Sequence, residues 1–282
     1  MRYIISLILI FLTNNLLFSQ EITLPSKVGN FTNASSISIN PTGYLFVSDV
    51  SSNEVYKLDT LGNELKSIGG YGWDEYSFDE PIDVFATTLN VYVCDKNNDR
   101  VQIFDKDLNF LTNFNTNNID NPDLAFAYPI CSGISSQGDI YVLDSDNQRI
   151  LKYNLSGELL HEIGSYEAGA FMLSNPTQFI VTPNNNLFVL DGKQIFVFDQ
   201  FGMGIQKINL DFEPLSINII FTDLVITSNS AIYYHNFSNP QFSLKKIYTA
   251  KNSDDHILDA VKFNQKLYIL FEDHIEIYQI TR

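Results

Sequence analysis

The chain has 282 residues, of which 33 are acidic and 17 are basic, and its formal net charge is −16 at pH 7. An acidic surface of this kind repels nucleic acid and anionic lipid, so the composition excludes a polyanion-binding role. Apolar residues make up 45% of the chain, which is enough for the core of one large domain.

The first twenty residues are predicted to be a signal peptide. Arg2 supplies a short positive region, residues 4–12 are almost wholly apolar, and polar residues interrupt the run at 13–15. This stretch is too short and too broken to span a bilayer, so we expect cleavage after Ser19 or Gln20. An uncleaved anchor is the alternative. Residues 21–282 are then expected to be secreted or periplasmic, without membrane insertion after cleavage.

A short strand of β-branched and aromatic residues that ends on an anchor position recurs along the chain. Its copies end at residues 49, 95, 144, 191, 228 and 271, with spacings of 46, 49, 47, 37 and 43 residues. A second strand that begins with Val or Ile follows each copy. Repeats of this length, each with four short strands, are typical of β-propeller blades. The sequence therefore predicts an all-β, six-bladed β-propeller over residues 21–282.

The two ends of the chain complete the count of strands. The sixth repeat stops near Ile280, one strand short, while residues 21–24 precede the first repeat as an unpaired strand. We expect residues 21–24 to form the outermost strand of the last blade, because this arrangement closes the ring and removes an exposed sheet edge.

The repeats carry a motif that resembles a known family. Residues 92–101 and 141–150 both read Tyr-Val-x-Asp-x-x-Asn-x-Arg followed by Val or Ile, and a glycine-containing link follows the repeat. This pattern resembles the NHL repeat, which implies a six-bladed propeller. Repeats five and six depart from it, with Ser228 and Phe271 where Asp is expected. The resemblance implies no single activity, because the family includes protein-binding, RNA-binding, sensor and enzymatic propellers.

Three long links, at 69–80, 115–128 and 164–175, lead into blades two, three and four. Antiparallel topology places these links and the anchor turns on one face. The first link carries the aromatic residues Tyr71, Trp73 and Tyr76 beside two carboxylates, a combination that suits a peptide, a sugar or a cation. Aromatic residues that only cover the blade edges are the alternative, and Phe78 is expected to lie beneath the link.

Arg100 and Arg149 fall on the motif within the same face. They are candidate ligand-binding residues together with the aromatic cluster, and we also expect each to pair with an acid in or beside its anchor turn. A calcium loop starting at Asp95 is excluded, because Arg100 stands where Gly is needed and Lys106 where Glu is needed.

The chain contains no motif of nucleophilic, phosphate-binding or zinc-protease chemistry. Asp83, Asp259 and His256 are weak candidates for a divalent ion in the central channel. No cofactor is expected, and calcium is the alternative. The inner strands also offer polar residues that ordered water would satisfy, among them Gln178 and Asn218.

Cys94 and Cys131, the two cysteines of the chain, lie in apolar strands. We expect free, buried thiols, with a disulfide between neighbouring repeats as the alternative.

The leading hypothesis is an exported, non-catalytic recognition module that binds a protein, peptide or glycan on its loop face, and not nucleic acid. The alternative is a metal-dependent hydrolase or lyase with a divalent ion in the channel.

Overall fold

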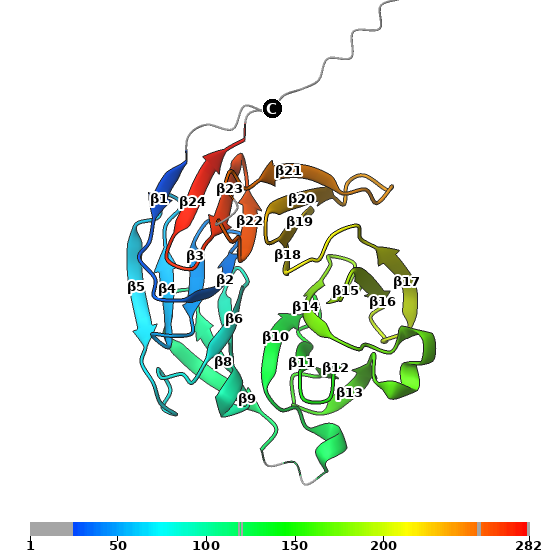
Figure 1. Ribbon diagram of the computed structural model, residues 1–282. Coiled ribbons are helices and arrows are strands. Elements are labelled where there is room, and N and C mark those ends of the chain that lie inside the picture. Colours follow the sequence, from blue (N-terminus) through cyan, green and yellow to red (C-terminus); the bar gives the residue numbers. More distant parts are fainter. Residues whose placement is uncertain (1–24, 118, 120, 253–254, 281–282) are drawn as a thin grey trace, which may run out of the picture.

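The computed structural model describes residues 25–117, 119, 121–252 and 255–280. These residues form six four-stranded antiparallel sheets arranged in a ring (Figure 1). The chain is therefore a six-bladed β-propeller, as predicted. The predicted signal peptide, residues 1–20, and the predicted closing strand, residues 21–24, lie outside the described residues.

Each of the first four blades takes its strands in chain order, from the innermost to the outermost. Blade 1 contains β2 (Ala34–Ile39), β3 (Leu45–Asp49), β4 (Glu54–Leu58) and β5 (Glu64–Gly69). Blade 2 contains β6 (Pro81–Ala86), β7 (Asn90–Asp95), β8 (Arg100–Asp105) and β9 (Phe110–Asn115). Blade 3 contains β10 (Pro129–Ile134), β11 (Ile140–Asp144), β12 (Arg149–Tyr153) and β13 (Leu159–Ile163). Blade 4 contains β14 (Pro176–Val181), β15 (Leu187–Asp191), β16 (Gln194–Phe198) and β17 (Gly204–Asn209).

The last two blades keep the same order. Blade 5 contains β18 (Ser216–Ile220), β19 (Asp223–Ser228), β20 (Ala231–Asn236) and β21 (Lys245–Thr249). Blade 6 contains β22 (Asp259–Phe263), β23 (Lys266–Leu270), β24 (Ile275–Gln279) and, from the other end of the chain, β1 (Ser26–Val28). Short 3-10 helices lie in the anchor turn of blade 2 (Lys96–Asn98) and in the links into blades 3 and 4 (Pro122–Leu124 and Tyr166–Phe171).

The N-terminal strand closes the ring, as predicted, but β1 begins at Ser26, two residues after the end of the predicted segment 21–24. β1 runs antiparallel to β24, with Val28 opposite Ile275. The chain is then held by two backbone bonds, in which Phe31 N donates to the Asp273 carbonyl and Ala34 N donates to the Glu272 carbonyl, both at 2.9 Å. These bonds fix the point where the chain enters blade 1, so the residues just before Phe31 are the ones that run along β24.

The hydrophobic core consists of layers between neighbouring blades. The described residues form six buried clusters, and each joins two adjacent blades. Between blades 1 and 2, for example, Phe46 packs with Val84 and Phe104. Because each sheet buries both faces against its neighbours, the second strands are apolar throughout, and this is the repeat that the sequence displays.

The four anchor aspartates tie each blade to the link that arrives from the preceding blade. Asp49 accepts a bond of 2.6 Å from Thr32 N, and Asp95 accepts one of 2.7 Å from Asp79 N. Asp191 accepts one of 2.7 Å from Asn175 N, and Asp144 a longer one of 3.3 Å from Ala127 N. Asp49 also accepts bonds within its own turn, from Ser51 N and Ser52 N, and Asp144 accepts one from Asn147 N, but the bond shared by all four anchors crosses to the link.

The closing strand also packs against blade 1, at the turn that contains Gly62. Gly62 has φ of +87°, and a Cβ at this position would overlap the side chain of Val28. Gly157 occupies the equivalent turn of blade 3 with φ of +79°, and a Cβ there would meet nothing closer than a Phe114 carbon at 3.6 Å. The two glycines therefore share backbone strain but differ in contact with the closing strand.

We predict that Gly62→Ala lowers the free energy of unfolding by about 1 kcal/mol more than Gly157→Ala. Both substitutions place alanine in a left-handed backbone conformation, which is unfavourable, but only the first displaces β1. Urea denaturation of the two variants measures the difference. Equal losses of stability would contradict the described closure of the ring.

Candidate functional site

The link that leads into blade 2, residues 70–80, forms a compact loop on the anchor-turn face. Gly72 N donates to the Phe78 carbonyl and Phe78 N donates to the Gly70 carbonyl, at 3.0 and 2.9 Å, so the loop is closed at its base. Phe78 is fully buried beneath it, as expected, and packs on Phe104. The fold thus holds both ends of the segment that carries the predicted aromatic cluster.

The cluster itself is divided between exposure and packing. Tyr71 is 73% exposed and Trp73 is 70% exposed. Tyr76 is less exposed, because its ring packs beside Phe104 and Phe110 and its hydroxyl accepts a bond from Phe110 N. Two aromatic side chains of the predicted cluster are therefore open to solvent, and the third joins the loop to blade 2.

Arg100 binds the buried side of this loop, residues 70–80, which we call the clamped loop. Its Nε donates to the anchor carboxylate of Asp95 at 2.7 Å, and Nη1 donates to the Trp73 carbonyl at 2.7 Å. Nη2 donates to the carbonyls of Asp74 and Ser77, at 3.1 and 2.9 Å. The side chain is almost wholly buried. The predicted pairing of Arg100 with an acid of its turn is confirmed, and the structure places the guanidinium beneath the loop.

Arg149 has the same arrangement one blade further on. Its Nε donates to the anchor carboxylate of Asp144 at 3.0 Å, and its Nη2 donates to the Ala125 carbonyl in the link into blade 3 at 3.0 Å. Glu162 on β13 accepts a further bond of 3.1 Å. The predicted pairing is confirmed here too. In both blades the arginine joins the anchor carboxylate to backbone carbonyls of the incoming link.

A ring of inner-strand residues lines the central channel at one level. Each blade contributes one residue, from its innermost strand. This residue pairs with the second-strand residue that comes just before the anchor position. In chain order the ring consists of Ser36, Asp83, Cys131, Gln178, Ser216 and Asp259. Blades 1 to 4 each have a β-bulge at this point of the innermost strand, which shifts the register by one residue.

The ring satisfies backbone groups that no strand reaches. The channel edge of each innermost strand has no neighbouring strand, so its N–H groups need other acceptors. Asp259 accepts from Ile37 N at 3.0 Å, and Gln178 accepts from Ile217 N at 2.7 Å. Polar residues in the channel therefore have a structural role that links one blade to the next.

Burial changes the acidity of the two channel carboxylates. It raises the pKa of Asp83 to about 6, and hydrogen bonds led by that from the Ser36 hydroxyl, at 2.9 Å, limit the rise. Burial raises the pKa of Asp259 to about 7, although Ile37 N and other donors stabilise its ionised form. Among the described residues, neither carboxylate forms an ion pair.

The structure does not gather the three predicted metal candidates around one point. Asp83 and Asp259 belong to the ring, but His256 is exposed in the link that precedes β22. Within residues 25–117, 119, 121–252 and 255–280, no group of three or more His, Cys, Asp or Glu side chains is placed to hold a metal ion. Metal binding by these residues stays a prediction.

Cys94 and Cys131 are both free and buried, as expected. They lie in neighbouring blades beside Asp83, and burial, reinforced by that carboxylate, raises the pKa of both thiols well above the ordinary value. Neither sulfur is therefore an activated nucleophile.

The described part of the chain also contains no helix with the length and apolar character needed to cross a membrane.

Fold and site together define a six-bladed β-propeller with NHL-like repeats. The chain shows distant homology to an NHL-repeat protein, Protein brain tumor from Drosophila melanogaster, with 31% identity over 144 residues. That match covers 49% of this chain and 13% of the relative, so most of the relative has no counterpart here. No family model matches the chain.

Solved structures of lyases share the fold. A solved structure of streptogramin B lyase superposes with a TM-score of 0.60 at 14% identity, covering 93% of this chain and 88% of the other. A catalytically inactive virginiamycin B lyase from Staphylococcus aureus, solved with quinupristin, gives 0.63 at 11% identity, covering 93% of this chain and all of the other. Identities this low show the common architecture alone.

We predict that Arg100→Ala lowers the free energy of unfolding by about 3 kcal/mol, because it leaves the Asp95 carboxylate and the loop carbonyls buried without their donors. Urea denaturation measures this loss, and the fluorescence anisotropy of Trp73, the single Trp of the chain, should fall as the loop loosens. Lys96→Ala is the matched control, because Lys96 lies in the same turn but pairs with Glu80 nearer the surface. Similar results for both variants would refute the clamp.

We predict that Asp83 makes stability fall as the pH rises. Its pKa of about 6 in the folded protein exceeds the ordinary 3.8, so the folded state binds more protons than the unfolded state between those values. By linkage, stability decreases across that window. Asp83→Asn removes this titration, so its Tm should fall less than that of the wild type between about pH 4 and pH 8. A slope for Asp83→Asn parallel to that of the wild type would disprove the assignment.

Proposed function

We propose that the protein is an exported recognition module that binds a protein, peptide or glycan on the anchor-turn face, with Tyr71 and Trp73 as the anchoring side chains. The observation that carries this proposal is the clamped loop: two aromatic residues are largely exposed, while the backbone that bears them is held by Arg100 from inside blade 2.

The free energy of binding favours exposed aromatic residues on a fixed loop. Trp and Tyr are the residues that most often dominate binding energy at interfaces, and they lose little entropy when bound. A loop already fixed by internal hydrogen bonds needs no further ordering on association, which reduces the cost of binding. Rigid presentation of exposed aromatic residues therefore favours recognition over simple coverage of a blade edge.

The chemistry of the loop also favours a class of partner. Asp74 and Glu75 lie between the aromatic residues and have exposed side chains, and the chain as a whole has a net charge of −16. A partner surface with basic or hydroxyl groups beside an apolar contact fits this combination. Nucleic acid does not, because its phosphates would meet like charge.

Affinity capture tests the proposal. The immobilised mature chain is incubated with an extract of the compartment outside the cytoplasm, and bound components are identified for the wild type and for Trp73→Ala, Tyr71→Ala and Phe201→Ala. Phe201 is the matched control, because it is an exposed aromatic residue in a turn at the other end of the blades, where β16 joins β17.

We expect Trp73→Ala to weaken the captured partner about 30-fold, the loss typical of an interface anchor, and Phe201→Ala to leave it unchanged. Isothermal titration calorimetry with the purified partner gives the affinities of the wild type and of the three variants. Retention of every partner by both Trp73→Ala and Tyr71→Ala would refute this location of the site.

A further inference from the structure

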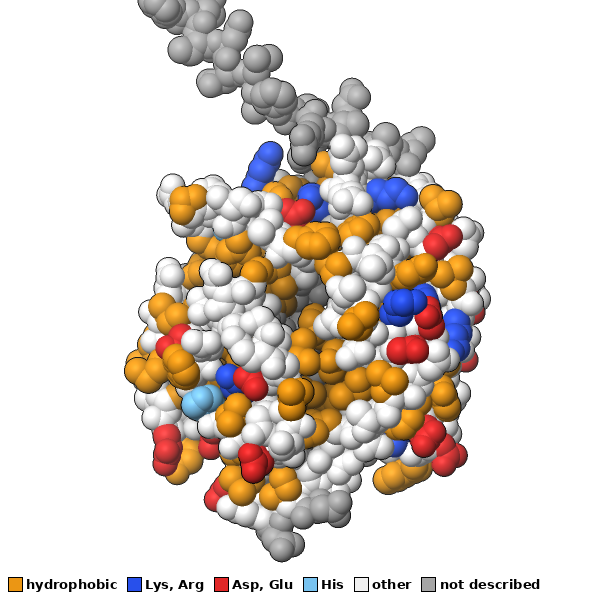
Figure 2. Space-filling view, turned by 180° about the vertical axis from the view of Figure 1, so that it is seen from behind, with side chains coloured by type: hydrophobic (Ala, Val, Ile, Leu, Met, Phe, Trp, Pro, Cys, Tyr) orange, Lys and Arg blue, Asp and Glu red, His pale blue; other side chains and the backbone are white. Residues whose placement is uncertain are grey.

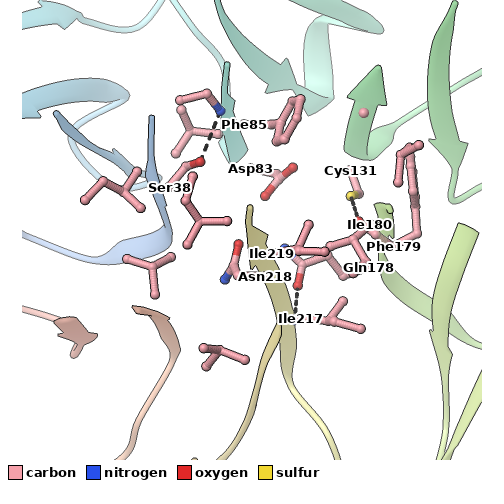
Figure 3. Close-up of a pocket in the computed structure, with 18 of the residues that line it drawn as sticks. Ser38, Asp83, Phe85, Cys131, Gln178, Phe179, Ile180, Ile217, Asn218 and Ile219 are labelled. Atoms are coloured by element: carbon pink, nitrogen blue, oxygen red, sulfur yellow. Dashed lines mark hydrogen bonds between the residues drawn. The ribbon is translucent and has the colours of Figure 1, made fainter. Parts of the chain in front are cut away.

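The central channel contains a cavity that opens away from the aromatic loop. It has a volume of about 40 Å³ and is lined chiefly by β6, β10, β14 and β18, from the level of the ring towards the ends of these strands (Figure 3). A space of this size accommodates about three water molecules or one small polar group. The clamped loop lies at the opposite ends of the same strands, so the two sites are separate.

The mouth of this cavity is mainly apolar, with hydroxyl and amide residues of the same turns, such as Thr87 and Ser135, among those that border it. It has a volume of about 340 Å³ and is bordered by the turns that follow the innermost strands of blades 1 to 5, where Phe85, Ile134, Val181, Ile219 and Phe221 contribute side chains. Figure 2 views the molecule from behind and shows a hollow at the centre of the ring, surrounded by hydrophobic side chains. Phe221 is largely exposed at the rim.

The interior, by contrast, presents hydrogen-bond acceptors. The Asp83 carboxylate is directed into the central space, as is the Asn218 amide (Figure 3). Asn218 donates through Nδ2 to Asp259 at 2.6 Å and to the Ala260 carbonyl at 3.2 Å, which fixes the amide and leaves its oxygen without a partner. Ser132 also lines the cavity, and its buried hydroxyl has no hydrogen-bond partner.

No cationic side chain of the described residues neutralises Asp83. The one lysine that lines the cavity, Lys262, pairs with Asp223 at 2.6 Å and donates to the Asn264 carbonyl at 3.2 Å. A buried carboxylate without a counterion is costly, and a ligand that brings a positive charge with N–H donors removes that cost.

We propose that this cavity binds the ammonium group of a small alkyl- or arylamine, with the apolar body of the ligand in the mouth. A primary ammonium has three donors, and Asp83, the Asn218 oxygen and the Ser132 hydroxyl supply three acceptors. The positive charge of the ligand lies beside Asp83 inside the channel, and the apolar residues of the mouth remove its hydrocarbon part from water. This site is independent of the recognition surface on the other face.

Isothermal titration calorimetry at about pH 8 tests the inference with hexylamine, whose ammonium remains protonated as that of a lysine does. 1-Hexanol serves as the uncharged probe of equal length. The variants are Asp83→Asn, which removes the charge inside the cavity, and Asp139→Asn, which removes one beside Lys152, outside the cavity. A series from methylamine to hexylamine probes the mouth in the wild type and needs no variant.

We expect hexylamine to bind the wild type and Asp139→Asn alike, and to bind Asp83→Asn at least tenfold more weakly. 1-Hexanol should bind at least tenfold more weakly than hexylamine, and affinity should rise severalfold as the chain lengthens. The proposal would be overturned if 1-hexanol bound as tightly as hexylamine, or if affinity did not depend on chain length. It would also be overturned if a folded Asp83→Asn variant bound hexylamine with wild-type affinity. Calcium that binds through Asp83 while hexylamine does not bind would overturn it as well.

Discussion

The bond between an anchor carboxylate and the backbone of the incoming link is the interaction on which the arrangement of the blades depends. A propeller blade has no strand-to-strand bond to its neighbour, so the packing layers between blades must be supplemented by contacts that fix direction. In blades 1 to 4 a buried aspartate at the end of the second strand accepts an N–H from a residue 16 or 17 positions earlier, in the link. The carboxylate thus joins two blades at one point.

That interaction also determines what the anchor-turn face can display. In blades 2 and 3 an arginine extends from the anchor carboxylate to carbonyls of the link, so the link is held along its length. The exposed Trp73 is a consequence, because its carbonyl is bound from inside while its ring faces solvent. Blades 5 and 6 have Ser228 and Phe271 at the anchor position, and in blade 6 the closing strand β1, from the other end of the chain, pairs with β24.

The architecture could be predicted because its signals are local. Each second strand, its anchor residue and the following strand lie within about fifteen residues, and burial between blades makes those strands uniformly apolar. The pairing of Arg100 with Asp95 was predictable for the same reason. The position of the closing strand was not predictable, because the sequence of residues 21–24 alternates between polar and apolar residues as a strand should. The register is fixed by Phe31 and Ala34, which bind the turn at Glu272 and Asp273 near the other end of the chain.

The contacts that form the candidate sites could not be predicted from the sequence, because they join residues that are far apart in the chain. Arg100 reaches carbonyls 23 to 27 residues earlier, and no local pattern indicates that contact. Asp83 was recognisable as a polar residue in an innermost strand, but its lack of a counterion depends on all six blades. His256 shows the limit of inference from position, because proximity to an inner strand in sequence did not bring its side chain into the channel.

Hydrogen exchange in the wild type and in Asp95→Asn tests most directly whether the anchor carboxylate holds its link. The substitution preserves the shape of the side chain and removes the charge that Arg100 and Asp79 N bind. We expect amides of residues 70–80 to exchange at least about tenfold faster in the variant, while those of 164–175, which Asp191 anchors, keep the wild-type rate. Unchanged exchange in 70–80, or equal acceleration in both links, would contradict this expectation.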